Sequence, residues 1–326
     1  MSSSITRSTL PAALALVVAA GSTWAQGQYP SRPIRIIVPF AAGGPTDFNA
    51  RLVSQRLNEA WGQPVIVENR PAAGGVPATE FVAKAAPDGY TLLGANPGPL
   101  TVAPHIRSNL GYDTMKDLLP IVLVTTTTSA VVVHPLVPAR SVKELIALAR
   151  KSPGRFNFAS SGNGSAPHLA VELFNAQAAI KLVHIPYKGG APALTALMGG
   201  EVDLMFDTFI TALPHVKSGR TRPLAVTSAR RAATFPDLPT VAESGLPGYE
   251  AGNWFALFAP AGTPQQAIDR AAQAVGKATA SPAFRERLAA QGAEPMTGTP
   301  ESLATLVRTE SARFARLIKD AGIRPE

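Results

Sequence analysis

Hydrophobic runs alternate with amphipathic segments along nearly the whole chain, a pattern that predicts strands alternating with helices. The clearest unit begins with an apolar run over 34–40, passes two adjacent glycines and enters a helical pattern over 49–61. Buried parallel strands read as such apolar runs. Pro45 suits the first position of a helix, with Gly44 as its N-cap. This stretch therefore predicts a strand, a glycine-rich loop and a helix, the step from which α/β folds are built.

Similar steps follow along the rest of the chain. Strands are expected over 64–68, 90–94, 157–160, 181–185, 203–206, 223–227 and 254–259, and helices over 77–86, 142–150, 169–178, 193–198, 213–218, 264–280, 282–291 and 300–321. The helix over 142–150 carries a capping box, with Ser141 as N-cap and Glu144 three residues later. This alternation argues for a parallel sheet with right-handed crossovers.

The run over 119–133 is longer than a typical strand. It contains six mostly apolar residues, four threonines, Ser129, Ala130 and three valines. One strand that leaves one domain and enters another would explain it, and so would two strands with a turn at Thr127 and Thr128; the pattern alone leaves both open. Residues 254–259 are a second candidate for a crossing between domains.

The first 25 residues have the organisation of a secretory signal peptide. Arg7 is their lone charge, residues 11–21 are apolar, and Thr23 and Ala25 place small residues at the −3 and −1 positions of a cut before Gln26. The apolar part is too short to span a bilayer; a retained anchor is the alternative. Because the chain has no cysteine, it has no lipid-anchor cysteine, thiolate nucleophile or thiolate metal ligand. We expect an exported, periplasmic protein that is free in solution.

Composition fits two domains with a weak preference for anions. The chain has 326 residues, 46% of them hydrophobic, and a net charge of +8, of which Arg7 contributes one. Its length suggests about two domains. Lysines and arginines are scattered and cluster only in pairs, such as Arg230 and Arg231, so no basic stripe predicts nucleic-acid binding. A mild positive field that attracts small anions is the better use of this charge.

Glycine-rich loops follow strands in both halves of the chain, at 40–47, 160–168 and 187–192. Each leads into a helix, so its backbone N–H groups lie at the positive end of a helix dipole, where anions bind. Hydroxyl groups of Thr46, Ser161 and Ser165 add further donors. Taken alone, the first loop is explained equally well as a tight turn. Its recurrence favours a site for a small carboxylate, because ligands of open α/β sheets bind where strands end.

Three aspartates near these loops have different expectations. Asp47, at the third position of its helix, is expected mainly to cap that helix and shape the loop. Asp203 starts a strand, and we interpret it as structural. Asp207 follows the same strand at its carboxyl end, where a structural role and a ligand-binding role stay equally open.

No motif predicts catalysis or metal binding. The loop over 160–168 has the context of a nucleophile elbow, but neither Ser161 nor Ser165 stands between glycines in the required frame. Pro167 occupies the last small-residue position of a dinucleotide fingerprint, which therefore fails. The five histidines lack metal-ligand spacing, so each is expected to be a surface or satisfied core residue: His105, His134, His168, His184 and His215. We expect no cofactor, no metal and no enzymatic activity.

Motifs along essentially the whole mature chain resemble those of the Bug family, the solute receptors of tripartite tricarboxylate transporters. They are Pro39-Phe-Ala-Ala-Gly-Gly-Pro-Thr-Asp47, Val67-Glu-Asn-Arg-Pro71, Pro87-Asp-Gly-Tyr-Thr-Leu92, Ser160-Ser-Gly-Asn-Gly164 with His168-Leu169, Pro186-Tyr-Lys-Gly-Gly190, Gly200-Glu-Val-Asp203, Pro239-Thr-Val-Ala-Glu243 and Phe258-Ala-Pro-Ala-Gly-Thr-Pro264. The segment 163–167 varies at positions that are variable in the family, so the resemblance does not identify the ligand.

The resemblance implies a two-lobed periplasmic-binding-protein fold of type II, a Venus flytrap with two hinge-crossing strands. Lobe one would comprise about 28–127 plus 253–326, and lobe two about 128–252. A ligand carboxylate would lie between the lobes, held by backbone amides, hydroxyls and ordered waters. Carried over residue by residue, the site would contain Phe40, Ala42, Gly43, Thr46 and Asp47 from lobe one, with Asn96 as a weaker candidate, and Ser161, Gly162, Gly164, Ser165, Tyr187, Lys188, Gly189 and Asp207 from lobe two.

The sequence therefore predicts a non-enzymatic, monomeric receptor in the periplasm that binds a small organic carboxylate. The resemblance implies that it delivers the ligand to the membrane subunits of a tripartite carrier, by closure of the lobes around the ligand. A receptor of the same fold that signals to a sensor is the first alternative. A secreted α/β hydrolase is the second, and the absence of a nucleophile–base–orienter set argues against it.

Overall fold

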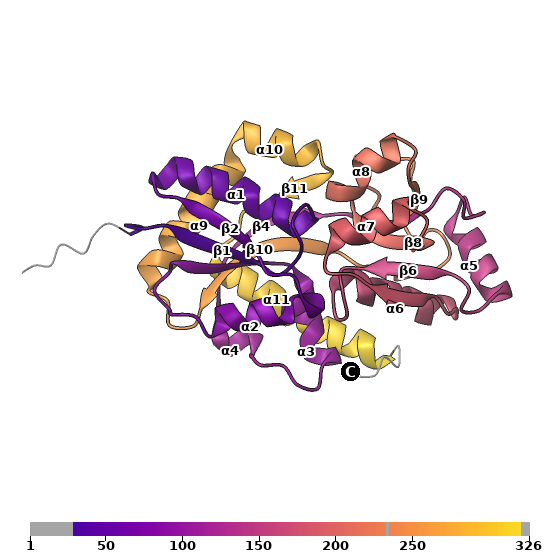
Figure 1. Ribbon diagram of the computed structural model, residues 1–326, viewed down its shortest axis with the longest axis horizontal. Coiled ribbons are helices and arrows are strands. Elements are labelled where there is room, and N and C mark those ends of the chain that lie inside the picture. Colours follow the sequence, from indigo (N-terminus) through magenta and orange to yellow (C-terminus); the bar gives the residue numbers. More distant parts are fainter. Residues whose placement is uncertain (1–28, 233–234, 321–326) are drawn as a thin grey trace, which may run out of the picture.

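The computed structural model describes residues 29–232 and 235–320, so the expected signal peptide over 1–25 lies outside the described residues. Two sheets lie beside each other along the long axis of the molecule, each with helices packed against it (Figure 1). We call the parts built on them the first half and the second half. The expected α/β architecture is confirmed.

The first half is built on a six-stranded sheet with the order β11-β4-β10-β3-β1-β2. Its strands are β1 (Ile34–Val38), β2 (Val65–Asn69), β3 (Thr91–Ala95), β4 (Leu118–Thr127), β10 (Asn253–Pro260) and β11 (Ala293–Pro295). Its helices are α1 (Pro45–Trp61), α2 (Val76–Ala83), α9 (Gln265–Ala280), α10 (Pro282–Ala289) and α11 (Pro300–Asp320), with short turns η1 (Ala73–Gly75), η2 (Gly98–Val102), α3 (Ala103–Ile106) and α4 (Thr114–Asp117). The pattern of apolar residues did not reveal these short turns or β11.

The second half is built on a five-stranded sheet with the order β7-β6-β8-β5-β9. Its strands are β5 (Ser129–Val133), β6 (Asn157–Ser160), β7 (Val183–Pro186), β8 (Leu204–Thr208) and β9 (Arg222–Val226). Its helices are α5 (Val142–Lys151), α6 (Ala166–Ala178), α7 (Gly190–Met198) and α8 (Phe209–Lys217). Ser141 caps α5 as expected, because its Oγ accepts the backbone N–H of Glu144 at 3.2 Å.

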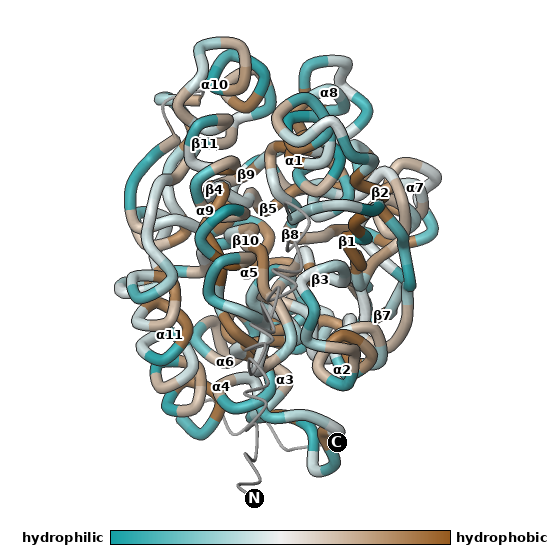
Figure 2. The backbone as a smooth tube through the Cα atoms, turned by 90° about the vertical axis from the view of Figure 1, so that its left-hand side faces the viewer, coloured by the Kyte–Doolittle hydropathy of each residue, from teal (hydrophilic) through white to brown (hydrophobic). Residues whose placement is uncertain are grey.

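Alternating residues of the central strands fill a separate core on each face of each sheet. In β1, Ile36 joins the cluster under α1 and α9, whereas Ile37 joins the cluster under α2 and α11. In β5, Val131 packs with α5 and α6, and Val132 packs with α7 and α8. This is the period-two alternation of a sheet buried on both faces. Figure 2 shows the hydrophobic residues of β1 and β10 in brown, with hydrophilic segments of the covering helices around them.

The expected parallel pairing is found in both sheets but does not extend to the strands that connect the halves. β1 pairs in parallel with β2 and β3, and β6 pairs in parallel with β7 and β8. However, β10 is antiparallel to β3 and β4, and β5 is antiparallel to β8 and β9. The reason is that β5 and β10 enter their sheets from the other half. They begin at the junction between the halves, where β1, β3, β6 and β8 end.

The run over 119–133 contains two strands, and the chain also crosses between the halves within it. β4 belongs to the first sheet, β5 belongs to the second, and Thr128 alone separates them. The return crossing is adjacent, because Asn253 at the start of β10 pairs with Thr127. The two connections between the halves therefore lie side by side.

Helix α11 contacts both halves of the molecule. Leu303 and Val307 lie in a core cluster of the first half, whereas Phe314 and Ile318 lie in a cluster formed mainly by the second half. Between them, the buried carboxylate of Glu310 accepts hydrogen bonds from Trp254 Nε1 at 2.8 Å and from Thr101 Oγ1 at 3.1 Å. In Figure 1, α11 runs along the lower edge from one half toward the other.

The two halves also touch across the loops that end their strands. The N–H of Ala41 donates to the backbone oxygen of Lys188 at 3.0 Å. Gly189 has φ +149°, and a Cβ added to it would lie 2.8 Å from the nitrogen of Ala41. Gly162 has φ +119°, and its added Cβ would lie 2.8 Å from the nitrogen of Gly74. Contacts this close leave no room for a side chain, so glycine permits the halves to close on each other.

We expect Gly189→Ala to open the junction between the halves. The substitution forces an L-residue into a strained conformation, at a cost of about 1–3 kcal/mol, and places a methyl group against Ala41. Gly219→Ala is the matched control, since Gly219 has φ +73° but nothing within 4 Å of an added Cβ. Small-angle X-ray scattering should give a larger radius of gyration for Gly189→Ala than for the wild type and the control. Equal radii for all three proteins would contradict the expectation.

Candidate functional site

A cavity lies at the junction, where strands of both sheets end. Its volume, taken as the space open to the centre of a water molecule, is about 40 Å³, room for roughly three waters. It is lined by Phe40, Pro45, Thr46, Asn96, Ser129, Ser161, Ala166, Pro167, Ala170, Gly190, Met205, Phe206, Asp207, Thr208, Ala251, Gly252 and Asn253. Both halves and both crossing connections therefore contribute to its wall.

Four helix N-termini contribute to the wall of this cavity. They are represented by Pro45 and Thr46 of α1, Ala166 and Pro167 of α6, Gly190 of α7, and Thr208, the N-cap of α8. α1 begins at Pro45 with Gly44 as its N-cap, as expected. α6, α7 and α8 begin three or four residues earlier than the hydrophobic pattern predicts, because their first turns are small or polar. These turns carry unsatisfied N–H groups and the positive end of the helix dipole. Their convergence produces a site with positive potential and no cationic side chain in its wall.

In the first half, Thr46 and Asn96 form the polar part of the wall, and both are buried. Asn96 Nδ2 donates to Thr46 Oγ1 at 3.3 Å, and Asn96 Oδ1 accepts the N–H of Gly98 at 3.1 Å. These two bonds fix the orientation of the amide. Because Thr46 Oγ1 accepts a hydrogen bond, its own proton remains available to a ligand.

In the second half, Ser161 lies in the wall and Ser165 lies beside it. Ser165 is the N-cap of α6, yet its side chain makes no capping bond. Its Oγ is fully buried and has no hydrogen-bond partner among the described residues. The backbone of Ser165 packs against Gly98, next to Asn96. A buried hydroxyl without a partner is costly, so Ser165 is a donor that a bound ligand would satisfy.

Asp207 is the one carboxyl among the residues that line the cavity. Its Oδ1 accepts the N–H of Thr208 at 2.9 Å, and its Oδ2 accepts the hydroxyl of Thr211 at 2.7 Å. Burial raises the pKa of this carboxyl from 3.8 to about 7, against the lowering effect of these two hydrogen bonds. Asp207 can therefore exchange a proton near neutral pH when the charge in the cavity changes.

Asp47 lies outside the cavity wall and fixes the first loop. It accepts hydrogen bonds from the N–H of Gly43, from Arg51 Nε and from Asn69 Nδ2, each at 2.9 Å. Burial opposes ionisation of Asp47, but the Arg51, Gly43 and Asn69 bonds together hold the pKa of its carboxyl below the usual value. Asn69 also donates to the oxygen of Phe40 at 3.0 Å. Sequence reasoning missed Arg51 and Asn69, which are distant in sequence from one another.

The structure brings part of the predicted site together. Of the residues expected to bind ligand, Phe40, Thr46, Asn96, Ser161 and Asp207 line the cavity. Ala42 and Gly43 are exposed. Gly162, Gly164, Tyr187, Lys188 and Gly189 lie in the loops behind the wall or between the halves. Ligand contact by any of these residues stays a prediction.

Sequence reasoning missed wall residues that come from the crossings and from β8. Ser129 and Asn253 stand where the chain enters β5 and β10, and Met205 and Thr208 flank Asp207. The two candidate crossings over 119–133 and 254–259 were recognisable in the sequence. They would have indicated Ser129 and Asn253, because a ligand held between two lobes must lie near the connections.

Two of the five histidines, which are distant in sequence, meet in the structure. The rings of His168 and His184 stack with centroids 4.0 Å apart. Ser160 Oγ lies 2.6 Å from His184 Nε2, but Ser160 is fully buried and also accepts the N–H of Gly162 at 3.1 Å. This serine–histidine contact is therefore structural, since the hydroxyl cannot reach a substrate.

Within residues 29–232 and 235–320, no cluster of three or more histidines, aspartates or glutamates is arranged to hold a metal ion. In the same residues, no helix combines the length and the apolar character needed to cross a bilayer.

Comparisons with known proteins agree with this geometry. The sequence model of the tripartite tricarboxylate transporter family receptors matches residues 49–323. This match confirms the resemblance that the motifs indicated.

Three similar solved structures share the fold. Rpa4515 of R. palustris, solved with adipate, is 36% identical, with a TM-score of 0.88 over 91% of this chain and 100% of its own. The periplasmic binding protein BugD is 38% identical, with a TM-score of 0.88 over 91% of this chain and 100% of its own. MatC (Rpa3494) of Rhodopseudomonas palustris, solved with bound malate, is 34% identical, with a TM-score of 0.86 over 89% of this chain and 100% of its own. The expected two-lobed periplasmic-binding-protein fold is therefore confirmed.

We expect Asp207 to make the ligand-free protein less stable as pH rises. Its pKa is 3.8 as an ordinary carboxyl and about 7 in the fold, so between these values the folded state holds a proton that the unfolded state has lost. The stabilisation present below the lower pKa is therefore lost by up to about 1.4 kcal/mol per pH unit across this window.

Urea unfolding of the wild type and of Asp207→Asn across this pH range measures the effect. The difference in unfolding free energy, wild type minus variant, should fall as pH rises. A difference that stays constant, or that rises with pH, would show that the fold does not raise the pKa of Asp207.

Proposed function

We propose that this chain, which belongs to the tripartite tricarboxylate transporter receptor family, captures a small organic carboxylate in the cavity between its two halves. The carrying observation is the convergence of four helix N-termini on a wall whose side chains include no cation. An anion is the ligand that such a wall stabilises. Adipate in Rpa4515 and malate in MatC support the carboxylate class.

Thr46, Ser161 and Ser165 are the proposed hydroxyl donors, and the first-turn N–H groups of the converging helices add backbone donors. A hydrogen bond to a charged acceptor contributes about 1.5–3 kcal/mol. Three or four such bonds offset an association cost of about 4 kcal/mol or more and leave room for micromolar binding, which corresponds to about −8 kcal/mol. No arginine clamp is required.

The proposed mechanism is closure of two lobes around the ligand. Lobe one comprises about 28–127 plus 253–326 in this proposal, and lobe two about 128–252. The adjacent crossings at Thr127 and Asn253 form the hinge, and bound ligand shifts the population toward the closed arrangement because donors from both lobes contact it together. The packing of α11 on both halves limits the opening, since Phe314 must leave or travel with its cluster.

The place of action follows from the same family. Its members include periplasmic binding proteins such as BugD, and we propose export of this chain with cleavage after Ala25. The closed protein then presents the ligand, as a monomer, to the membrane subunits of its carrier. Enzymatic activity is not part of the proposal, because neither of the serine–histidine side-chain contacts among the described residues, Ser160–His184 and Ser311–His105, lies in the cavity wall.

A thermal-shift panel tests the ligand class. Ligand binding to the folded state raises the melting temperature. We expect a rise with one or more members of a panel of monocarboxylates, dicarboxylates including adipate and malate, and aromatic acids, and no rise with uncharged sugars. Stabilisation by sugars or cations alone would refute the carboxylate proposal.

We expect Ser165→Ala to separate binding from stability. The substitution removes a buried hydroxyl that has no partner among the described residues, so the ligand-free protein should unfold at an unchanged or slightly higher urea concentration. Affinity for the carboxylate identified by the panel should fall about tenfold, the value of one charge-assisted bond. Calorimetric titration measures the affinity.

Ser161→Ala, in the cavity wall, should also lower the affinity for the carboxylate. Ser218→Ala is the control. Ser218 lies at the C-terminal end of α8, opposite the end that reaches the cavity, and its Oγ donates to the oxygen of His215 at 3.2 Å. Unchanged affinity in the double variant Ser161→Ala with Ser165→Ala would remove this loop from the site.

A further inference from the structure

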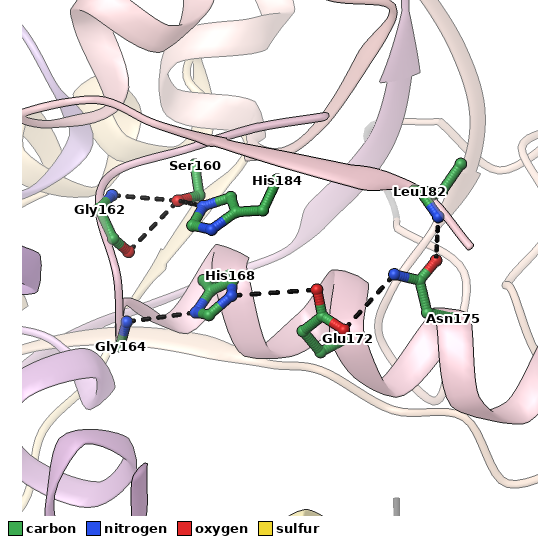
Figure 3. Close-up of polar contacts among 8 residues, drawn as sticks. All are labelled: Ser160, Gly162, Gly164, His168, Glu172, Asn175, Leu182 and His184. Carbon is green, nitrogen blue, oxygen red and sulfur yellow. Dashed lines mark hydrogen bonds and ion pairs between the residues drawn. The ribbon is translucent and has the colours of Figure 1, made fainter. Parts of the chain in front are cut away.

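Two stacked histidines lie behind the ligand loop of the second half. His168 is on α6 and His184 is on β7, and their rings are nearly parallel, with an interplanar angle of 14°. Phe158 of β6 continues the stack, with its ring centroid 4.8 Å from that of His184. Figure 3 shows the pair beside the loop that contains Gly162 and Gly164. Neither histidine lines the cavity, and the proposed ligand contacts do not include them.

The contacts of His168 define which of its nitrogens carries the proton. The N–H of Gly164 donates to His168 Nδ1 at 3.2 Å, so Nδ1 must be unprotonated. The proton of the neutral ring therefore lies on Nε2, which faces Glu172 Oε1 at 3.9 Å (Figure 3). A second proton on Nδ1 would place two N–H donors against each other and break the bond to Gly164.

The second ring holds the start of the same loop. His184 Nε2 lies 2.6 Å from Ser160 Oγ, and this oxygen accepts the N–H of Gly162 at 3.1 Å. The segment between these two anchors contains Ser161, in the cavity wall, and ends at Ser165, the N-cap of α6. The backbone geometry of the proposed carboxylate donors thus depends on both imidazoles, and at His168 it depends on an unprotonated Nδ1.

We propose that His168, in its neutral Nε2–H form, is a positioning residue for the carboxylate site, and that its protonation releases the Gly162–Ser165 loop and weakens ligand capture. The loop is also a contact between the halves, since Gly162 lies against Gly74, so closure weakens together with binding. The predicted effect on ligand affinity rests on the proposed function, whereas the predicted protonation of His168 does not.

The charged and titratable groups around His168 favour its neutral form. Burial, followed by the charge of His168, lowers the pKa of His184 to about 3, so His184 stays neutral while His168 titrates. Burial raises the pKa of Glu172 above its usual value, which reduces its ability to stabilise a protonated His168 as pH falls. Arg107 lies on the other side of Gly164 and donates to the oxygen of Asn163 at 3.3 Å, and Tyr249 donates to the oxygen of Ala170 on the core side of α6. The positive guanidinium of Arg107 disfavours a second cation nearby.

Nuclear magnetic resonance of ligand-free protein labelled with ¹⁵N tests the proton arrangement. At pH 8, the His168 signals should show an unprotonated Nδ1 and a protonated Nε2. The Gly164 amide shift should then move with the same midpoint as the His168 ring when the sample is acidified, while His184 does not titrate in that range. A proton on Nδ1 at pH 8, or a Gly164 amide that ignores the His168 titration, would overturn the proposal.

Adipate binding by wild type and His168→Gln tests the consequence for capture. Glutamine Oε1 can accept the Gly164 N–H and does not titrate. Between pH 8 and one unit below the His168 midpoint, wild-type affinity should fall about fivefold or more relative to the variant, the value of a lost hydrogen bond. Protonation of adipate affects both proteins equally and cancels in this ratio. Identical pH profiles would overturn the proposal.

His134→Gln is the matched control, since His134 Nδ1 also accepts a backbone N–H, that of Leu136 at 3.3 Å, at the end of β5 far from the cavity. This variant should follow the wild-type pH profile, and a flat profile here would show that histidine replacement in general, not His168, removes the pH response. Failure of all these proteins to bind adipate at pH 8 would count against that ligand only. The resonance experiment would then decide the inference.

Discussion

The direction in which strands meet the junction is the constraint on which the rest of the molecule depends. β1, β6, β7 and β8 all end there, so the helices that follow them, α1, α6, α7 and α8, begin there. The two halves can be linked without disturbing this arrangement because the linking strands β5 and β10 run the opposite way, and antiparallel pairing accommodates them in the sheets. A site for an anion therefore arises from backbone geometry before any side chain is chosen.

Such a site imposes local costs that the loops absorb. Close approach of the halves requires glycine at positions such as Gly162 and Gly189, where any side chain would hold the halves apart. The hydroxyl of Ser165 is left buried without a partner among the described residues, a penalty that a ligand would remove. The packed cores on both faces of each sheet supply the stability that offsets these defects. The same buried hydroxyl therefore lowers the stability of the ligand-free protein and would strengthen ligand binding.

The sequence was most informative where function depends on local order along the chain. Strand, glycine-rich loop and helix start could be recognised at Thr46 and Ser161 because all three lie within a few residues. The pairing of β10 and the meeting of His168 with His184 could not, because periodicity reports which face a residue presents and not which distant segment it meets. Asp207 was ambiguous for a related reason. Its role depends on burial from both halves, and burial of that kind is a property of the closed fold.

The two loops that we propose to bind the ligand, over 40–47 and 160–168, are positioned by different chemistry, and this difference has a physical consequence. In the first half, Asp47 is held by Arg51 and Asn69, and its pKa is lowered, so that loop keeps its anchors across the neutral and mildly acidic range. In the second half, two imidazoles hold the loop, and His168 must keep its Nδ1 unprotonated to accept the N–H of Gly164. Acidification is therefore expected to loosen only the loop of the second half. Since a ligand between two lobes needs donors from both, loosening one loop is sufficient to release it, while the other half keeps its fold.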